Sequence, residues 1–292
     1  MKSSKNNIKP LFSTDITFDK KNKTINGLEF ITRTASKQKI EEYDHKRENL
    51  NQTIEKSKLP LWLQIIKLFS GWFSIIVLFS CIRAGFKTAW KNASVLIIIG
   101  VFCGILWIIL HIVSKSKEKQ VLKEENAEKK LEELNGDFIS IQDELNVPGD
   151  AAEIDVLSFR YKLKNGAIRP SAIGMQMTLY FNAIVKIYAT SDELHIADLE
   201  NVYSFPKSSI KSIITVNKRI CVPTWNKEEN PTKGKFKPYK MTVNNFGHVF
   251  FKPYYILEIE KEGEFFGVYF PCYELDTIEN LTGLTASVSP NE

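Results

Sequence analysis

The sequence predicts a membrane protein in which a two-helix transmembrane hairpin, flanked by cytoplasmic helices, carries a C-terminal, mainly-β domain capped by a helix. Two long apolar stretches close together within 61–113 predict the hairpin. Beyond Val147, short β-type runs separated by Pro, Gly, Asn and Asp predict the β domain. The predicted parts are an N-terminal cytoplasmic segment at 1–58, the hairpin at 59–114, a helical linker or stalk at 115–147, the β domain at 148–286 and a tail at 287–292.

The second apolar stretch is the clearer of the two. Ala93 to Val113 runs for 21 residues without a formal charge, and as a helix it covers roughly 30 Å, the thickness of the hydrocarbon core of a bilayer. The first stretch, Leu61–Ile82, contains Gln64 and Lys67. A lysine near the end of a span can extend its ammonium group to the interface. We therefore predict a span here too, with a re-entrant or interfacial segment as the alternative.

Ten residues, Arg83–Asn92, join the two stretches, so both termini should lie on the same side of the membrane. The flanks near the open end of the hairpin hold ten Lys and Arg, against three in the joining segment, and cytoplasmic flanks carry such an excess. The first 60 residues are polar and show no signal-peptide pattern. We therefore expect a multi-pass protein of the plasma (inner) membrane, integral to the lipid bilayer, with both termini cytoplasmic.

Small residues recur at four-residue spacing in both stretches: Ser70 and Ser74 in the first, Gly100 and Gly104 in the second. This spacing lets helix backbones approach closely inside a membrane. Two interpretations follow. Gly100 and Gly104 could join copies of the chain into a homo-oligomer, or the small residues could pack one span against the other within one chain.

A polar helix is predicted on each side of the hairpin. In Ser36–Lys58 apolar residues fall at heptad positions, and Ser116–Asn135 is rich in Lys, Glu, Leu and Ala, with Gly136 expected to end the helix. The two could pair as an antiparallel coiled coil, a stalk roughly 30 Å long, or remain separate solvated helices. Further upstream, alternating apolar and polar residues in Ile16–Phe30 predict a small hairpin or an added edge strand.

The predicted β domain ends in an amphipathic helix at Tyr273–Leu284. Between Tyr255 and Glu260 side chains alternate as in a half-buried antiparallel strand, and Glu262 and Gly263 predict a short hairpin turn after it. The expected strands are Ile154–Leu163, Thr178–Tyr188, Glu193–Ala197, Val202–Phe205, Ile210–Val216, Tyr239–Val243, Tyr254–Ile259 and Phe265–Phe270.

Within Ala189–Ile214, a D-x-L-x-I strand is followed by an aromatic strand and a turn of the form F-P-x-S-x-I-x-S-I. The residues concerned are Asp192, Leu194, Ile196, Tyr203, Phe205, Pro206, Ser208 or Ser209, Ile210, Ser212 and Ile213. This pattern resembles the bacterial pleckstrin-homology-like (PH-like) and GRAM-like domains, over about 154–284 and with a long insertion at Lys218–Phe236. The resemblance implies a PH-like barrel, often carried by a two-span anchor, that binds or scaffolds without catalysis.

Positive charge is concentrated between Pro206 and Lys252. Ten Lys and Arg stand there against two Glu, a net charge of +8 in a chain whose total is +5, and aromatic residues are interleaved. Such a segment suits anionic lipid head groups, polyanions or an acidic protein, whereas no motif indicates nucleic acid. The alternative is a solvated, lysine-rich loop. The candidate binding residues are Lys207, Lys211, Lys218, Arg219, Lys233, Lys235, Lys237 and Lys240.

The sequence contains no H-E-x-x-H, G-x-S-x-G, Walker-type loop or C-x-x-C. Cys221 or Cys272 could act as a nucleophile only beside a base such as His195 or His248, and inert buried thiols are the default. We therefore expect that the chain is not an enzyme and that it binds neither a metal ion nor a cofactor. Two functions remain: a non-enzymatic, membrane-anchored binding or scaffold module, or a two-span effector whose β domain senses a ligand and whose helices then cluster to perturb the membrane.

Overall fold

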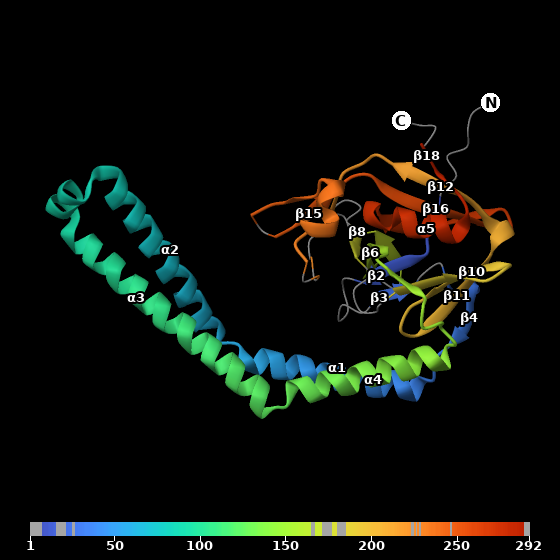
Figure 1. Cartoon of the computed structure of the whole chain (residues 1–292), viewed down its shortest axis with the longest axis horizontal. Coiled ribbons are helices and arrows are strands. Elements are labelled where there is room, and N and C mark those ends of the chain that lie inside the picture. The colour runs from blue at the N-terminus through green and yellow to red at the C-terminus, as the bar shows by residue number, and fades with distance from the viewer. Residues whose placement is uncertain are drawn as a thin grey trace. The chain divides into compact units, whose positions relative to one another are not determined.

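The computed structural model describes residues 8–15, 22–24, 27–164, 167–170, 177–179, 185–222, 225, 227, 229–245 and 247–288 (Figure 1). The chain forms two compact units. The helical unit is Glu41–Phe138, and the β unit combines Met1–Ile40 with Ile139–Glu292. This differs from the division expected from the sequence, in which residues 1–58 form a segment of their own, because the N-terminal residues supply strands to the β unit.

Two long apolar helices make up most of the helical unit and run side by side (Figure 1). Helices α2 (Leu61–Ala84) and α3 (Phe86–Glu124) are joined by Gly85 alone. Its φ of 76° is a conformation that glycine adopts without strain. The segment expected to join the spans, 83–92, is helical except at Gly85, and it ends at a kink in α3 at Ala93, with φ −147° and ψ 36°.

Both helices are long and apolar enough to cross a membrane. Within the chain, only 11% of the apolar window of α2 and 17% of that of α3 is buried. Exposed apolar surface of this extent marks contact with lipid or with another protein. The large apolar side chains that are at least 61% exposed include Leu61, Phe69, Trp72, Phe79, Phe102 and Ile112.

Small residues bring α2 and α3 together. A Cβ built on Gly100 would be 2.7 Å from Cγ1 of Val77, and one built on Gly104 would be 2.8 Å from Oγ of Ser74. Ser70 is also buried, and its hydroxyl donates a 3.1 Å hydrogen bond to a carbonyl one turn earlier in its own helix. Gly100, Gly104 and Ser74 thus pack the two helices within one chain, as one of the two interpretations expects.

Polar helices flank the apolar pair in the sequence. They are α1 (Lys37–Ser57) and α4 (Ala127–Glu144). Within residues 41–138 they are tied by polar contacts: Lys46 Nζ lies 2.7 Å from Oδ2 of Asp137, and Lys130 Nζ donates a 3.1 Å hydrogen bond to Oγ1 of Thr53. Figure 1 shows the two helices running alongside each other here.

The apolar contacts expected between these helices are only partly present. Leu50 and Leu134 are 9% and 8% exposed, whereas Ile54 and Leu131 are 39% and 48% exposed. Gly136 does not end the second helix, so that prediction is wrong. A glycine inside a helix costs about 1 kcal/mol relative to alanine, and the turns beyond it are stabilised by burial of apolar side chains such as Ile141.

The β unit contains three sheets in the described part of the chain, and none of them closes on itself. The largest has the strand order β18-β12-β16-β17-β6-β2-β3, with β1 beside β17 and with β7 and β8 beside β6. Its strands are β1 (Lys9–Pro10), β2 (Phe12–Asp15), β3 (Asn22–Thr24), β6 (Leu157–Lys164), β7 (Ala167–Pro170), β8 (Met177–Leu179), β12 (Ile210–Val216), β16 (Tyr254–Lys261), β17 (Glu264–Pro271) and β18 (Ala286–Val288).

The second sheet has the order β4-β11-β10-β9-β5 and the third the order β13-β15-β14. Their strands are β4 (Ile31–Thr34), β5 (Ala152–Ile154), β9 (Val185–Ala189), β10 (Glu193–Ala197), β11 (Asn201–Pro206), β13 (Ile220–Val222), β14 (Thr242–Val243) and β15 (Val249–Phe251). Helix α5 (Leu275–Thr282) follows the last long strand of the first sheet.

Strands from the two ends of the chain pair with each other. β2 is parallel to β6, β1 is parallel to β17, and β4 is antiparallel to β11. The hairpin expected at Ile16–Phe30 begins earlier, because β2 pairs with β3 in the register Phe12↔Thr24. Residues 16–21 and 25–26 of that prediction lie outside the described residues.

Two apolar cores stabilise the β unit. The first lies between the two larger sheets and includes Phe205, Leu257 and Phe270, with Ile278 contributed by α5. The second core lies between the third sheet and the opposite face of β16 and β17, which contributes side chains such as Ile256. Strand β16 is thus buried on both faces along part of its length, rather than half-buried throughout as its alternation predicts.

Most of the expected β runs contain strands, and the β-rich nature of the C-terminal part is confirmed. Of the run expected at Tyr239–Val243 only Thr242 and Val243 form a strand, and residues 180–184 of the run expected at Thr178–Tyr188 lie outside the described residues. Glu262 and Gly263 form the predicted hairpin turn, with φ values of 54° and 80°. The C-terminal helix is present but starts with a short 3-10 helix, η4 (Cys272–Glu274), and ends at Gly283. The short strands β13, β15 and β18 have no counterpart in the sequence prediction.

Candidate functional site

The basic segment between Pro206 and Lys252 is folded. It contains the 3-10 helices η2 (Lys207–Ser209) and η3 (Gly234–Tyr239), strand β12 and all three strands of the small sheet. Phe236, Val249 and Phe251 are at most 2% exposed and belong to the second core. The segment is therefore not one continuous loop, because buried aromatic and aliphatic side chains alternate with the lysines and fix its described residues to the β unit.

Four of the eight candidate cations lie on one turn, which we call the basic turn: Lys233, Lys235, Lys237 and Lys240. Phe236 anchors this turn, and the four lysines are all exposed. Lys235 Nζ lies 2.8 Å from Oε1 of Glu229. The other three form no ion pair with any described residue. As far as the described residues go, their ammonium groups can meet an anionic partner.

The other four candidates lie elsewhere in the segment. Lys207 belongs to η2, and Lys211 on β12 pairs with Glu260 at 3.2 Å. Lys218 and Arg219 precede β13, and the Arg219 guanidinium lies 4.5 Å from the centre of the Phe250 ring. The sequence therefore predicted one set of eight residues, whereas in the structure four of them share the basic turn and Arg219 donates a 2.9 Å hydrogen bond to Thr242, just after that turn.

A pocket of about 280 Å³ opens beside the basic turn. Its walls come from β5, from the segment before η3, from η3 itself and from η4. Sequence analysis missed most of this site, because residues more than 100 positions apart build it and no short motif joins them. The lining residues are Glu153, Lys227, Lys235, Phe236, Tyr239, Tyr273 and Glu274.

A polar cluster forms the inner side of this pocket. Asp155 Oδ2 lies 2.6 Å from Nζ of Lys227 and accepts a 2.8 Å hydrogen bond from the hydroxyl of Tyr273. The backbone N–H of Asp155 donates a 3.1 Å hydrogen bond to Oε1 of Glu274. Glu274 is only 9% exposed. One residue, Asp155, thus fixes a lysine, a tyrosine and a glutamate around the same space.

Burial controls the protonation of this cluster. It raises the pKa of Glu274 to about 7, and the neighbouring carboxylate of Asp155 adds to the rise. Burial also raises the pKa of the Tyr273 hydroxyl. It raises the pKa of the nearby Cys272 thiol to about 11. Cys272 is therefore a thiol at neutral pH, whereas Glu274 is poised between its charged and neutral forms.

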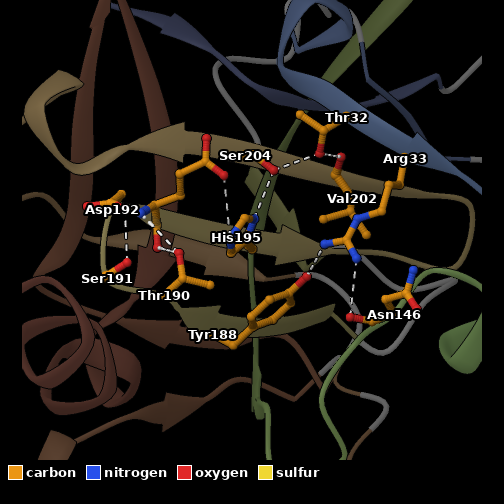
Figure 2. A network of polar contacts seen from close by, with 11 residues as sticks. Thr32, Arg33, Asn146, Tyr188, Thr190, Ser191, Asp192, His195, Val202 and Ser204 are labelled. Atoms are coloured by element: carbon orange, nitrogen blue, oxygen red, sulfur yellow. Dashed lines mark hydrogen bonds and ion pairs between the residues drawn. The ribbon is translucent and has the colours of Figure 1, made fainter.

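A second polar network crosses the second sheet (Figure 2). His195 on β10 is 5% exposed, and its Nδ1 lies 2.8 Å from the hydroxyl of Ser204, its cross-strand partner on β11. The Ser204 hydroxyl lies 2.6 Å from that of Thr32 on β4. The ring of Tyr188 on β9 stacks on the imidazole, with 4.7 Å between the ring centres. The Tyr188 hydroxyl accepts a 2.6 Å hydrogen bond from Arg33.

This network is suited to holding strands together. Burial lowers the pKa of His195, so its imidazole is neutral at physiological pH. Ser204 is only 6% exposed, and Glu193 lies 3.8 Å from Nε2 of the histidine. Among the described residues, the ring nitrogens of His195 meet Ser204 and Glu193, and the histidine pairs with neither Cys221 nor Cys272.

No group of three or more His, Cys, Asp or Glu residues within the described ranges is placed to hold a metal ion. Comparisons of the chain with protein-family models, with curated proteins and with solved structures find no match. The function is therefore argued from the geometry of the chain alone.

Proposed function

We propose that this chain is a non-enzymatic, membrane-anchored binding module whose β unit captures an acidic protein segment through the basic turn. The observation that carries the proposal is the display of Lys233, Lys237 and Lys240. These lysines are exposed, have no ion pair within the described chain and are held on a turn whose Phe236 is buried. A fixed group of free cations attracts an acidic partner at lower entropic cost than flexible lysines would.

The anchor in this proposal is the α2–α3 pair, embedded in the plasma (inner) membrane. Its support is the exposed apolar surface of both helices. Strand pairing supports a two-span topology independently. Because β4 pairs with β11 and β2 with β6, the segments before and after the helix pair fold into one unit. They must therefore lie on the same side of the membrane, and the lysine excess of the flanks favours the cytoplasm.

The proposal keeps the PH-like relationship for the β unit. Two facing sheets with a shared core, followed by a C-terminal helix that inserts Ile278 into that core, support it. The pattern residues Leu194, Ile196 and Phe205 belong to the same core. The absence of sheet closure in the described residues is the departure from a barrel.

The chemistry of the basic turn favours a protein over a nucleic acid. Proteins that bind single-stranded nucleic acid combine cations with exposed aromatic faces on which bases stack. Here Phe236 is 2% exposed, and Tyr239 is half-buried beside the pocket. These two rings therefore offer no fully exposed face beside the lysines, as suits acidic side chains of a protein.

The test uses the full chain in neutral nanodiscs and poly-L-glutamate as an acidic-chain probe. We expect binding that weakens with salt and that falls at least about tenfold when Lys233, Lys237 and Lys240 are all changed to Gln. The matched control changes Lys115, Lys119 and Lys123 to Gln, which removes the same charge from α3. Equal loss in both triple variants would show that net charge, and not the basic turn, is responsible. Anionic vesicles as a second probe separate lipid from protein binding.

The two-span effector is the second candidate, and the structure offers it less support. In that proposal the helices of several copies cluster through small residues. Gly100 and Gly104 already receive Val77 and Ser74 of the same chain. Clustering would therefore need another face. Membrane depolarisation on overexpression that is lost when exposed residues of that other face, such as Phe69 and Phe102, are changed would favour the effector.

A further inference from the structure

The pocket beside the basic turn differs from it in charge. Two of its lining residues are cationic, Lys227 and Lys235, and two are acidic, Glu153 and Glu274. The lining residues sum to zero formal charge when Glu274 is ionised, and the adjoining carboxylate of Asp155 adds negative charge. The lysines of the basic turn that do not line the pocket, Lys233, Lys237 and Lys240, are all positive. A polyanion that suits the turn would meet carboxylates inside the pocket. The two sites therefore select different ligands.

The buried carboxyl group of Glu274 is the acidic end of the pocket. One oxygen, Oε1, accepts the N–H of Asp155, and the side chain lines the cavity. An ionised carboxyl oxygen has room for further hydrogen bonds, and at this burial an incoming ammonium group would interact with it strongly. The exposed Glu153 adds negative charge at the mouth.

The cationic end is supplied by the two lysines. Lys227 forms an ion pair with Asp155 at 2.6 Å. Lys235 forms an ion pair with Glu229 at 2.8 Å. An ammonium group carries three N–H donors. Each lysine can therefore keep its present partner and still donate to an anionic group of a ligand.

Aromatic rings form the remaining walls. The Phe236 and Tyr273 rings meet edge to face at 5.1 Å between centroids, and Tyr239 and Tyr273 meet at 6.1 Å. Such rings fix the shape of the pocket and attract the carbon-bound hydrogens next to an ammonium group. The volume of about 280 Å³ is slightly below the range of roughly 300–1,000 Å³ typical of drug-sized ligands. The ligand should therefore be small.

We infer that this pocket binds a small zwitterion, a molecule that carries an ammonium group and a carboxylate or phosphate. The ammonium lies at Glu274 between the aromatic rings, and the anionic group lies at Lys227 and Lys235. Free amino acids, free phosphoethanolamine and the phosphoethanolamine head group of a lipid share this chemistry. The inference goes beyond the proposed function. Capture of an acidic protein segment at Lys233, Lys237 and Lys240 needs neither the zwitterion nor Glu274.

The experiment is a ligand-observed NMR titration of the purified full chain in a neutral detergent. The probes are O-phosphoethanolamine, glycine and a short-chain phosphatidylethanolamine, with inorganic phosphate and ethylamine as the separate halves. We expect at least one zwitterion to bind about tenfold or more tightly than either half. A response to the short-chain lipid and to no free zwitterion assigns the head group as the source, and a response to glycine assigns free amino acids.

Two variants test the named residues. Glu274→Gln keeps the shape and the acceptor for the Asp155 N–H, and it should weaken zwitterion binding about tenfold or more. Lys235→Gln, at an exposed position, tests the opposite end without risk to the core. Lys237→Gln lies on the same turn but not in the pocket, and it should bind zwitterions like the wild type.

Three results would overturn the inference: no saturable binding of any zwitterion, phosphate binding as tight as zwitterion binding, or equal effects of Lys235→Gln and Lys237→Gln. Any of them leaves the polyglutamate test of the basic turn intact. Loss of polyglutamate binding in the lysine triple variant, in turn, does not affect the zwitterion titration. The two proposals can therefore fail separately.

Discussion

Gly100 of α3 lies directly against Val77 of α2. A Cβ on Gly100 would be 2.7 Å from Cγ1 and 2.8 Å from Cβ of Val77, closer than carbon atoms pack. The two helices can approach to this distance only because residue 100 has no side chain. The contact sets the spacing of the apolar pair.

Replacement of Gly100 by Val should therefore separate α2 from α3 and destabilise the helical unit by about 1–3 kcal/mol, the usual cost of overpacking. Thermal unfolding in detergent, followed by circular dichroism, measures the change. Gly136→Ala is the matched control, because nothing lies within 4 Å of a Cβ at that helical position. It should be neutral or stabilising by up to about 1 kcal/mol. Equal melting temperatures for wild type and Gly100→Val would contradict the packing described here.

Glu274 should make the β unit less stable as the pH rises from 4.5 to about 7. Its pKa moves from the ordinary 4.5 to about 7 on folding, because of burial. In this interval the folded chain binds more protons than the unfolded chain, so the free energy of unfolding falls with increasing pH. The largest change that this pKa shift allows is about 3 kcal/mol. Denaturant unfolding of wild type and Glu274→Gln at pH 5 and pH 8 measures it, and identical pH dependence in both would refute the assignment.

His195 should make the β unit less stable as the pH falls below 6.5. Burial lowers its pKa below 6.5, Arg33 lowers it further and Glu193 opposes them. Below pH 6.5 the unfolded chain takes up a proton that the folded chain resists, so stability falls as the pH decreases. His195→Gln should lose part of this acid sensitivity, whereas His45→Gln, at an exposed position on α1, should keep it. Unfolding curves between pH 5 and pH 7 decide between these outcomes.

Phe236→Ala should release the basic turn without changing its charge. Phe236 is 2% exposed, and removal of a buried phenylalanine ring costs about 3–5 kcal/mol. We expect faster amide hydrogen exchange in β13, η3 and β15 and weaker polyglutamate binding. Phe250→Ala, at a half-buried ring that faces Arg219, is the control. Unchanged polyglutamate binding in Phe236→Ala would mean that anchoring of the turn is not needed.

Local patterns predicted the elements of the chain well, because each rests on near neighbours in the sequence. The uncharged run at 93–113 lies within α3, and the Glu262 and Gly263 pair forms the turn between β16 and β17. Alternation along β16 predicted its burial on one face only. The second face is covered by Phe251 and other residues of the small sheet, which no pattern inside the strand can reveal.

The candidate site depended on long-range folding and was harder to predict. Charge counting identified Lys233, Lys235, Lys237 and Lys240, which lie within one turn. It did not find Glu274, whose burial depends on packing beside Asp155, more than 100 residues away. It also placed Lys207 and Lys211 in the same group, although Lys207 lies in η2 and Lys211 near the start of β12.

Strand β4 has a consequence for biosynthesis. Thr34 and its partner Asn201 are 167 residues apart, and the ribosome adds about 5–20 residues per second. The first strands therefore wait on the order of ten seconds for their partners, and both apolar helices are complete before the partners emerge. Nascent chains that stall before Asn201 would carry a finished anchor and an unpaired β4, an exposed edge of the kind that chaperones recognise.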